Sequence, residues 1–195
     1  MLNRQQLRRE LRRRRAALAP RARAAAAERI ARHAGRSPWL QPGRRIGLYA
    51  SYGNEVDTGP LRRLAARRGC EVYLPRITSH RSRTMSFWRD SGRYRPNRLG
   101  IPEPVTGPVR AVRHLDLVFV PLTGFDERGY RLGVGGGYYD RAFAYRGRGG
   151  GGRPLLVGIA FDCQRTSQFL PEAHDVPLDL VITESGILDC RRRRR

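Results

Sequence analysis

Apolar and polar residues form two kinds of pattern along the chain, one typical of helices and one typical of buried strands. Leucines at helical spacing predict an amphipathic helix over residues 2–18 with a basic face, and the alanine-rich residues 21–34 predict a second helix. Short apolar runs bounded by turn residues are typical of strands buried in a parallel sheet. Such runs occupy residues 46–50, 70–76, 117–120, 155–161 and 178–183.

The order of these elements predicts the fold class. A helix is expected over residues 60–68, and the alternating residues 84–89 predict an antiparallel edge strand. Strands that alternate with helices favour an α/β protein, here a three-layer αβα sandwich whose sheet is mostly parallel. A single domain is expected over residues 1–190, followed by a disordered arginine tail over residues 191–195.

The most informative stretch runs from residue 116 to residue 141. A buried strand is expected to stop at Pro121, because proline cannot donate to a sheet. Four glycines in residues 133–137 then lead into a helix that starts at Tyr138. Glycines let backbone N–H groups approach a bound anion closely, and a helix N-terminus favours negative charge. A nucleotide site and a simple tight turn are both compatible with this pattern alone.

Charge and cysteine content bound the function further. The net charge is +22, and every basic residue apart from histidine is an arginine. This uniform choice points to coding bias, although such a field also attracts polyanions. Three scattered cysteines without a CxxC pair argue against disulfides and a zinc site, and favour a reducing cytoplasm. No apolar run approaches the roughly 20 residues of a membrane span, and no signal peptide is expected.

The string from Arg131 to Arg141, RLGVGGGYYDR, preceded by Phe125-Asp126, resembles the signature of the 5-formyltetrahydrofolate cyclo-ligase family. The resemblance extends from Leu7-Arg8 to Ile182-Thr183. It implies closure of 5-formyltetrahydrofolate to 5,10-methenyltetrahydrofolate with ATP and magnesium, and release of ADP and phosphate.

The resemblance also implies roles for particular residues. Catalytic residues would be Arg131, Tyr138 and Arg141. ATP would contact Arg4, Arg8, Arg131, Leu132, Gly133, Val134, Gly135, Gly136, Gly137, Tyr138 and Tyr139. The folate substrate would contact Ala50, Glu55, Gly135, Gly136, Gly137 and Tyr138. Magnesium would bind Asp140 and Asp175.

Each of these roles has a structural alternative. The basic face of the first helix is also what a solvated surface looks like, and Asp175 could cap a turn. Glu55 follows a strand at the end where open α/β sheets bind ligands, so a ligand contact is favoured there. The chain departs from the family pattern at Gly136, where some members have a lysine, and at Arg4, where a lysine is common.

Two other functions remain open at this point. The arginine runs suggest a nucleic-acid-binding protein, but interleaved aromatics and a recognisable binding module are missing. The glycine loop also suits a different nucleotide or sugar-phosphate enzyme. The favoured expectation is a monomeric cytoplasmic ligase that acts on a small-molecule folate, with or without a polyglutamate chain, and has no specific nucleic-acid or membrane partner.

Overall fold

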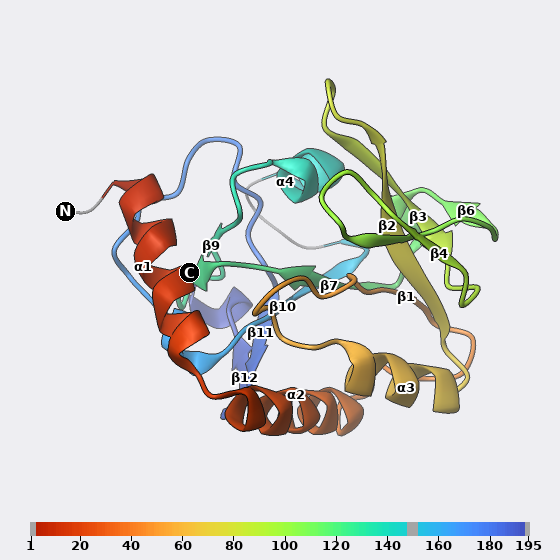
Figure 1. Cartoon of the computed structure of the whole chain (residues 1–195), viewed down its shortest axis with the longest axis horizontal. Helices are drawn as coiled ribbons and strands as arrows, with labels where there is room; N and C mark the ends of the chain where they lie inside the picture. Colours follow the sequence, from red (N-terminus) through yellow and green to blue (C-terminus); the bar gives the residue numbers. More distant parts are fainter. Residues whose placement is uncertain (1–2, 148–151, 194–195) are drawn as a thin grey trace.

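The computed structural model describes residues 3–147 and 152–193. Its centre is an eight-stranded sheet in the order β12-β11-β10-β7-β1-β2-β3-β6 (Figure 1). Two small sheets, β4-β5 and β8-β9, stand apart from it. The strands are β1 (Arg45–Gly47), β2 (Glu71–Ser79), β3 (Thr84–Arg89), β4 (Tyr94–Pro96), β5 (Pro102–Pro104), β6 (Val109–Arg110), β7 (Leu117–Pro121), β8 (Gly124–Phe125), β9 (Arg131–Leu132), β10 (Leu155–Ile159), β11 (Leu180–Thr183) and β12 (Gly186–Asp189).

Helices cover both faces of the sheet. The α-helices are α1 (Arg4–Ala17), α2 (Pro20–Gly35), α3 (Gly59–Arg67) and α4 (Tyr138–Phe143). The 3-10 turns are η1 (Val112–His114), η2 (Ala144–Arg146), η3 (Asp162–Gln164) and η4 (Arg191–Arg193). In Figure 1, α2 and α3 lie below the sheet and α4 lies above it. The expected three-layer α/β architecture in one domain is confirmed.

Alternate residues of the central strands supply the two cores. Phe119 of β7 packs with Ile30 of α2 and Leu61 of α3 in one cluster. Its neighbour Val120 points the other way, into a cluster that contains Phe143 of α4. This is the two-residue period of a strand buried on both faces, so the apolar run at residues 117–120 has the structure that its pattern predicts.

The sheet topology corrects the expectation that residues 84–89 form an edge strand. Five strands, β11, β10, β7, β1 and β2, run parallel, and β3 pairs antiparallel with β2 as expected. However, β3 is not an edge, because the short strand β6 pairs with it. At the other edge, the strand β12 folds back on β11 in a hairpin with Glu184 and Ser185 at its turn. Gly186 has a φ of +150°, which a glycine adopts easily.

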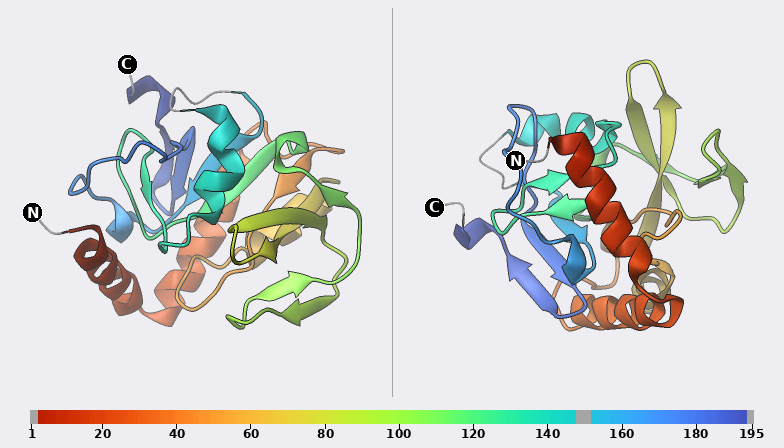
Figure 2. Two further views of the ribbon diagram at one scale, coloured as in Figure 1. Left: turned by 90° about the horizontal axis from the view of Figure 1, so that it is seen from above. Right: turned by 60° about the vertical axis from the view of Figure 1, so that its left-hand side comes forward.

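Two segments extend beyond the layered core. Helix α1 lies at one end of the sheet, far from β4 and β6 (Figures 1 and 2), and packs against η3, which follows β10. The hairpin of β2 and β3 projects on the same side of the sheet as α4 (Figure 1). Of the arginine tail, residues 191–193 form η4, and residues 194–195 lie outside the described part. No helix within that part combines the length and apolarity that a membrane crossing requires.

Candidate active site

The glycine loop connects β9 to α4 and has the backbone freedom that its sequence predicts. Gly135 has a φ of +104°, and Gly137, the N-cap of α4, has a φ of +69°. L-residues with a side chain are strained in this region, so the loop path depends on glycine. Nothing lies within 4 Å of the position that a Cβ would take at Gly133. Because α4 has only six residues, its dipole is short, and an anion here also needs side-chain cations.

Helix α1 supplies those cations. Arg8 donates from Nε to the carbonyl oxygen of Gly133 at 2.9 Å, and Arg12 donates to the carbonyl oxygen of Val134 at 3.3 Å. Partial burial lowers the pKa of Arg8, and the nearby charges of Arg4 and Arg12 lower it further. Arg8 forms no ion pair with any described residue. Its remaining N–H groups therefore stay available to phosphate oxygens beside the glycine loop.

The two predicted metal ligands lie close together but are each held by an arginine. Asp140 accepts a hydrogen bond from Nη2 of the buried Arg131 at 2.5 Å and from the backbone of Val176 at 3.4 Å. Asp175, the residue before Val176, accepts from Nη1 of Arg4 at 3.0 Å. The loop before β11 thus reaches the start of α4. The structure therefore brings the two carboxylates into one region.

These residues fit a magnesium–nucleotide complex in part. Oδ2 of Asp140 accepts no hydrogen bond from the described residues, and the side chain is 21% exposed, so it can take an ion. Both oxygens of Asp175 are occupied, by Arg4 and by the backbone N–H of Glu172. Within residues 3–147 and 152–193, no three acidic, histidine or cysteine side chains form a metal cluster. Magnesium needs only one or two carboxylates when phosphates supply further oxygens.

Glu55 lies in the loop after β1, on the side of the glycine loop that carries Tyr139. Burial raises the pKa of Glu55, and the N–H of Tyr52, which donates to Oε2 at 3.1 Å, opposes that rise. Burial, and next the Glu55 charge, raises the pKa of Tyr139. The same two causes raise the pKa of Tyr49. A half-buried carboxylate near tyrosines is suited to accept hydrogen bonds from a flat heterocycle.

The wall beside Glu55 includes a segment that is distant in sequence. A Cβ at Gly100 would lie 3.8 Å from the Tyr52 ring, so the turn before β5 borders the Glu55 loop. Ala50, the other predicted folate contact, is half-buried in the segment between β1 and this loop. Asp57 accepts from the N–H of Gly59, the first residue of α3, at 2.8 Å, which is a structural role.

The three predicted catalytic residues differ in burial and in their contacts. Arg131 is buried, and besides Asp140 it contacts the carbonyl oxygen of Val176. Tyr138 shares a 3.1 Å hydrogen bond with Nδ1 of His80, at the tip of the β2–β3 hairpin. Arg141 is exposed, and in the described part of the chain it forms no ion pair. Arg131 therefore lies behind Asp140, whereas Tyr138 is at the surface of the loop.

Sequence reasoning missed two groups of residues near the loop. The β2–β3 hairpin brings His80 to Tyr138, and brings Arg83 to within 3.8 Å of a Cβ placed on Gly137. Helix α1 adds Arg12 and the buried Arg15. A four-residue spacing from Arg8 could have indicated Arg12, because such residues share a helix face. Nothing local indicates the hairpin residues, because their approach depends on the tertiary fold.

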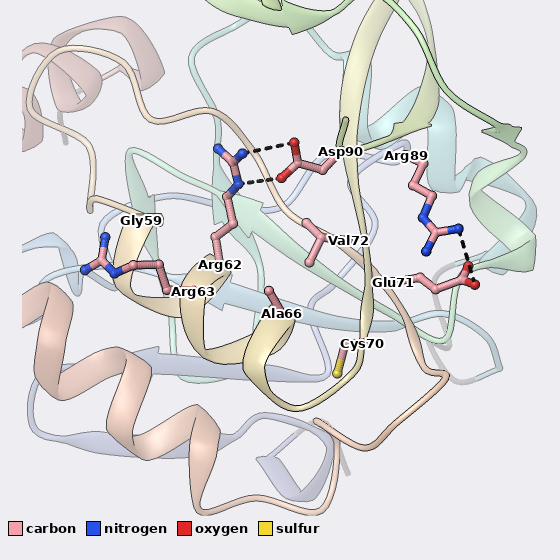
Figure 3. Close-up of a pocket in the computed structure, with 9 residues that line it drawn as sticks. All are labelled: Gly59, Arg62, Arg63, Ala66, Cys70, Glu71, Val72, Arg89 and Asp90. Atoms are coloured by element: carbon pink, nitrogen blue, oxygen red, sulfur yellow. Dashed lines mark hydrogen bonds and ion pairs between the residues drawn. The ribbon is translucent and has the colours of Figure 1, made fainter. Parts of the chain in front are cut away.

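A separate groove lies away from the glycine loop. It has a volume of about 400 Å³ and is lined by Gly59, Arg62, Arg63, Ala66, Cys70, Glu71, Val72, Arg89 and Asp90 (Figure 3). Its charges are already matched, because Arg62 pairs with Asp90 and Arg89 pairs with Glu71. The groove is lined by none of the glycine-loop residues. The glycine loop is therefore the better candidate for an anion site, because Arg8 and Arg12 beside it form no ion pair with the described residues.

Comparison with known proteins decides the family. The model of the 5-formyltetrahydrofolate cyclo-ligase family matches residues 1–184. The chain belongs to the 5-formyltetrahydrofolate cyclo-ligase family. The enzyme of that name from Escherichia coli K12 is 34% identical over 150 residues, which cover 73% of this chain and 79% of the relative. The one from Haemophilus influenzae is 33% identical over 181 residues, which cover 90% and 94%.

Solved structures agree with this assignment. The 5,10-methenyltetrahydrofolate synthetase of Aquifex aeolicus is 28% identical, with a TM-score of 0.83 over 97% of this chain and 94% of the other. The synthetase of Mycoplasma pneumoniae, 24% identical, has the same fold with a TM-score of 0.74 over 94% and 99%. The predicted family is therefore confirmed, and the cyclo-ligase family member described here is a ligase that acts in folate metabolism.

Proposed function

We propose that this cyclo-ligase uses ATP and magnesium to close 5-formyltetrahydrofolate to 5,10-methenyltetrahydrofolate, with release of ADP and phosphate. One observation carries the proposal. Arg8 lies against the carbonyl oxygen of Gly133 and has no carboxylate partner in the described part of the chain. A guanidinium in this state, beside a loop that requires positive φ angles, is suited to bind phosphate.

The remaining ATP contacts follow from the position of Arg8. Residues 131–139 form the strand end, the loop and the start of α4, so the triphosphate would lie along their backbone. Arg4 is on the same face of α1 as Arg8, one turn earlier, and is 21% exposed. When a phosphate draws Arg4 away, Asp175 is released to join Asp140 at magnesium.

The folate would bind on the opposite side of the loop. Its pterin ring would lie between the loop of Ala50 and Glu55 and the residues from Gly135 to Tyr138. Glu55 accepts hydrogen bonds from the N–H groups of the ring, and half-buried Tyr138 closes one side of the site. This places the N5-formyl group towards the glycine loop, where the γ-phosphate of ATP is expected.

The chemistry needs alignment and charge neutralisation more than a protein nucleophile. The formyl oxygen attacks the γ-phosphorus and ADP leaves; N10 then attacks the activated carbon, loses its proton, and phosphate departs with the oxygen. Asp140 and Asp175 would hold the magnesium ion, which would supply positive charge to neutralise the phosphates. Arg8, Arg141 and the loop N–H groups bind phosphoryl oxygens, and Arg131 holds Asp140 in place.

We also propose that the enzyme acts as a monomer in the cytoplasm and accepts folates with or without a polyglutamate chain. The exposed arginines of α1 offer cations to the carboxylates of such a chain. The charge of these arginines supports the proposal about the polyglutamate chain. Size-exclusion chromatography with light scattering checks the monomer. Comparing KM for mono- and pentaglutamylated substrate checks the preference.

The decisive experiment measures ADP release by purified protein with magnesium-ATP. ADP should appear only when 5-formyltetrahydrofolate is present, together with the absorbance of 5,10-methenyltetrahydrofolate. Equal ADP release without folate would indicate a different nucleotide enzyme. No release with folate, together with salt-sensitive binding of nucleic acid, would favour a polyanion-binding protein instead.

A further inference from the structure

One buried arginine of helix α1 has no carboxylate partner among the described residues. Arg15, in the last turn of α1, is only 9% exposed, and its Nε is buried without a hydrogen-bond partner. Its guanidinium forms no ion pair with the described residues. The other buried arginines behave differently, because Arg131 pairs with Asp140 and Arg146 pairs with Asp179. Arginine is seldom buried unless it is paired, so this arrangement calls for a partner that is not part of the protein.

Arg15 lies one helical turn after Arg12, which donates to the carbonyl oxygen of Val134 in the glycine loop. Burial lowers the pKa of Arg15, and the charge of Glu55 is the largest influence that opposes this. Conversely, Arg15 is the strongest charge that lowers the pKa of Glu55. The charges of the two side chains act on each other, yet in the described part of the chain they form neither a hydrogen bond nor an ion pair. A buried cation and a half-buried anion that stay apart leave room for a group that contacts both.

The chemistry of that group follows from the two side chains. Glu55 is an acceptor and Arg15 is a donor only. A ligand that satisfies both must present N–H donors beside a carbonyl oxygen. The edge of a 2-amino-4-oxopteridine has this pattern, with the 2-amino group and N3–H next to the carbonyl at C4. If Glu55 binds the two donors, the neighbouring carbonyl oxygen also enters the buried site and requires a donor of its own.

We propose that Arg15 is a substrate-binding residue whose guanidinium donates to the C4 carbonyl oxygen of the pterin, beside the Glu55 carboxylate. The inference rests on the proposed function, because it assumes a folate in the site. It assigns Arg15 to recognition of the ring, whereas Arg8 and Arg4 on the same helix serve the phosphates. One helix would then contact both substrates, and its two ends would set the distance between them.

The test uses full-length Arg15→Met, which keeps the approximate length and apolar stem of the side chain and removes the donor. KM for 5-formyltetrahydrofolate should rise about tenfold or more, the loss expected for a hydrogen bond to a charged group. KM for ATP should stay within about twofold. The melting temperature without ligands should be unchanged or higher, because an unpaired buried charge has been replaced by an apolar side chain. Arg9→Met, on the exposed face of the same helix, is the matched control.

The outcomes separate this inference from the proposed function. If the wild-type protein shows no folate-dependent ADP release, the function itself fails. If the wild type is active and Arg15→Met keeps the wild-type folate KM, the assignment of Arg15 is wrong. A lower melting temperature with both KM values unchanged would indicate a structural role instead. Should Arg15→Met not fold, Arg15→Lys, which keeps the charge on one compact donor nitrogen and loses the planar guanidinium, should raise the folate KM alone, and an unchanged value would overturn the inference.

Discussion

The ion pair between Arg131 and Asp140 allows a quantitative prediction about the site. Its nitrogen and oxygen are 2.5 Å apart, and the two side chains are 3% and 21% exposed. Asp140→Asn keeps an oxygen that accepts from Arg131 but removes the charge that the buried guanidinium needs. Breaking a fully buried pair costs about 3–5 kcal/mol. A single hydrogen bond to a charged group contributes about 1.5–3 kcal/mol.

Because Asp140 is one-fifth exposed and its replacement still accepts a hydrogen bond, we expect a loss of about 2 kcal/mol in the free energy of unfolding. For a chain of this length, about 2–4 °C of melting temperature corresponds to each kcal/mol, so the shift should be about 4–8 °C. Calorimetry without ligands measures it. Asp189→Asn is the matched control, since it weakens the exposed pair with Arg191 and should shift the melting temperature much less.

The same variant tests the metal assignment when activity is measured well below its melting temperature. Asparagine is a weaker magnesium ligand than aspartate, so half-maximal activity should require more magnesium, and turnover at low magnesium should fall sharply. A melting temperature within 1 °C of wild type would refute the account of the ion pair. Normal turnover with an unchanged magnesium requirement would refute the metal assignment.

Three further predictions concern other parts of the site. Glu55→Gln should raise the folate KM roughly tenfold, leave the ATP KM nearly unchanged, and increase stability at pH 7, because it removes a carboxylate that burial penalises. Because the pKa of Glu55 is raised, its carboxylate takes up a proton at a pH above the ordinary glutamate pKa of about 4.3. The wild-type KM for folate should therefore rise as the pH is lowered through this range, and Glu55→Gln should lose this dependence. Gly137→Ala should cost about 1–2 kcal/mol in a urea titration, because its φ is +69°, and a cost near zero would contradict the left-handed loop. Arg8→Met should raise the ATP KM about tenfold and Arg9→Met should not; equal effects would show that only net charge matters.

Much of the fold can be predicted from local pattern. The run at residues 117–120 is apolar on both faces, which determines a central strand, and Pro121 ends it because proline cannot donate. The spacing of Leu7 and Leu11 determines which face of α1 is buried. By contrast, β6 and β12 are too short to produce a periodic signal, and only pairing with β3 and β11 makes them strands.

The candidate site likewise has features that local sequence predicts and features that depend on the tertiary structure. The glycine loop could be identified in the sequence because its backbone conformation restricts the residue type, and the family signature spans it. Local sequence does not determine which charges meet. Asp140 and Asp175 are 35 positions apart, and Asp175 is held by Arg4 from the first turn of α1.

The most consequential difference concerns arginine, because the chain uses it for every strong cation. Sequence alone cannot separate an arginine on a solvated surface from one in a site, and both kinds occur in α1. Folding decides the matter through burial and distance: Arg9 remains in water, Arg8 reaches the glycine loop, and Arg15 is buried with its Nε unpaired among the described residues. Residue type and helical spacing are properties of the sequence, but desolvation and the meeting of distant charges exist only in the tertiary structure.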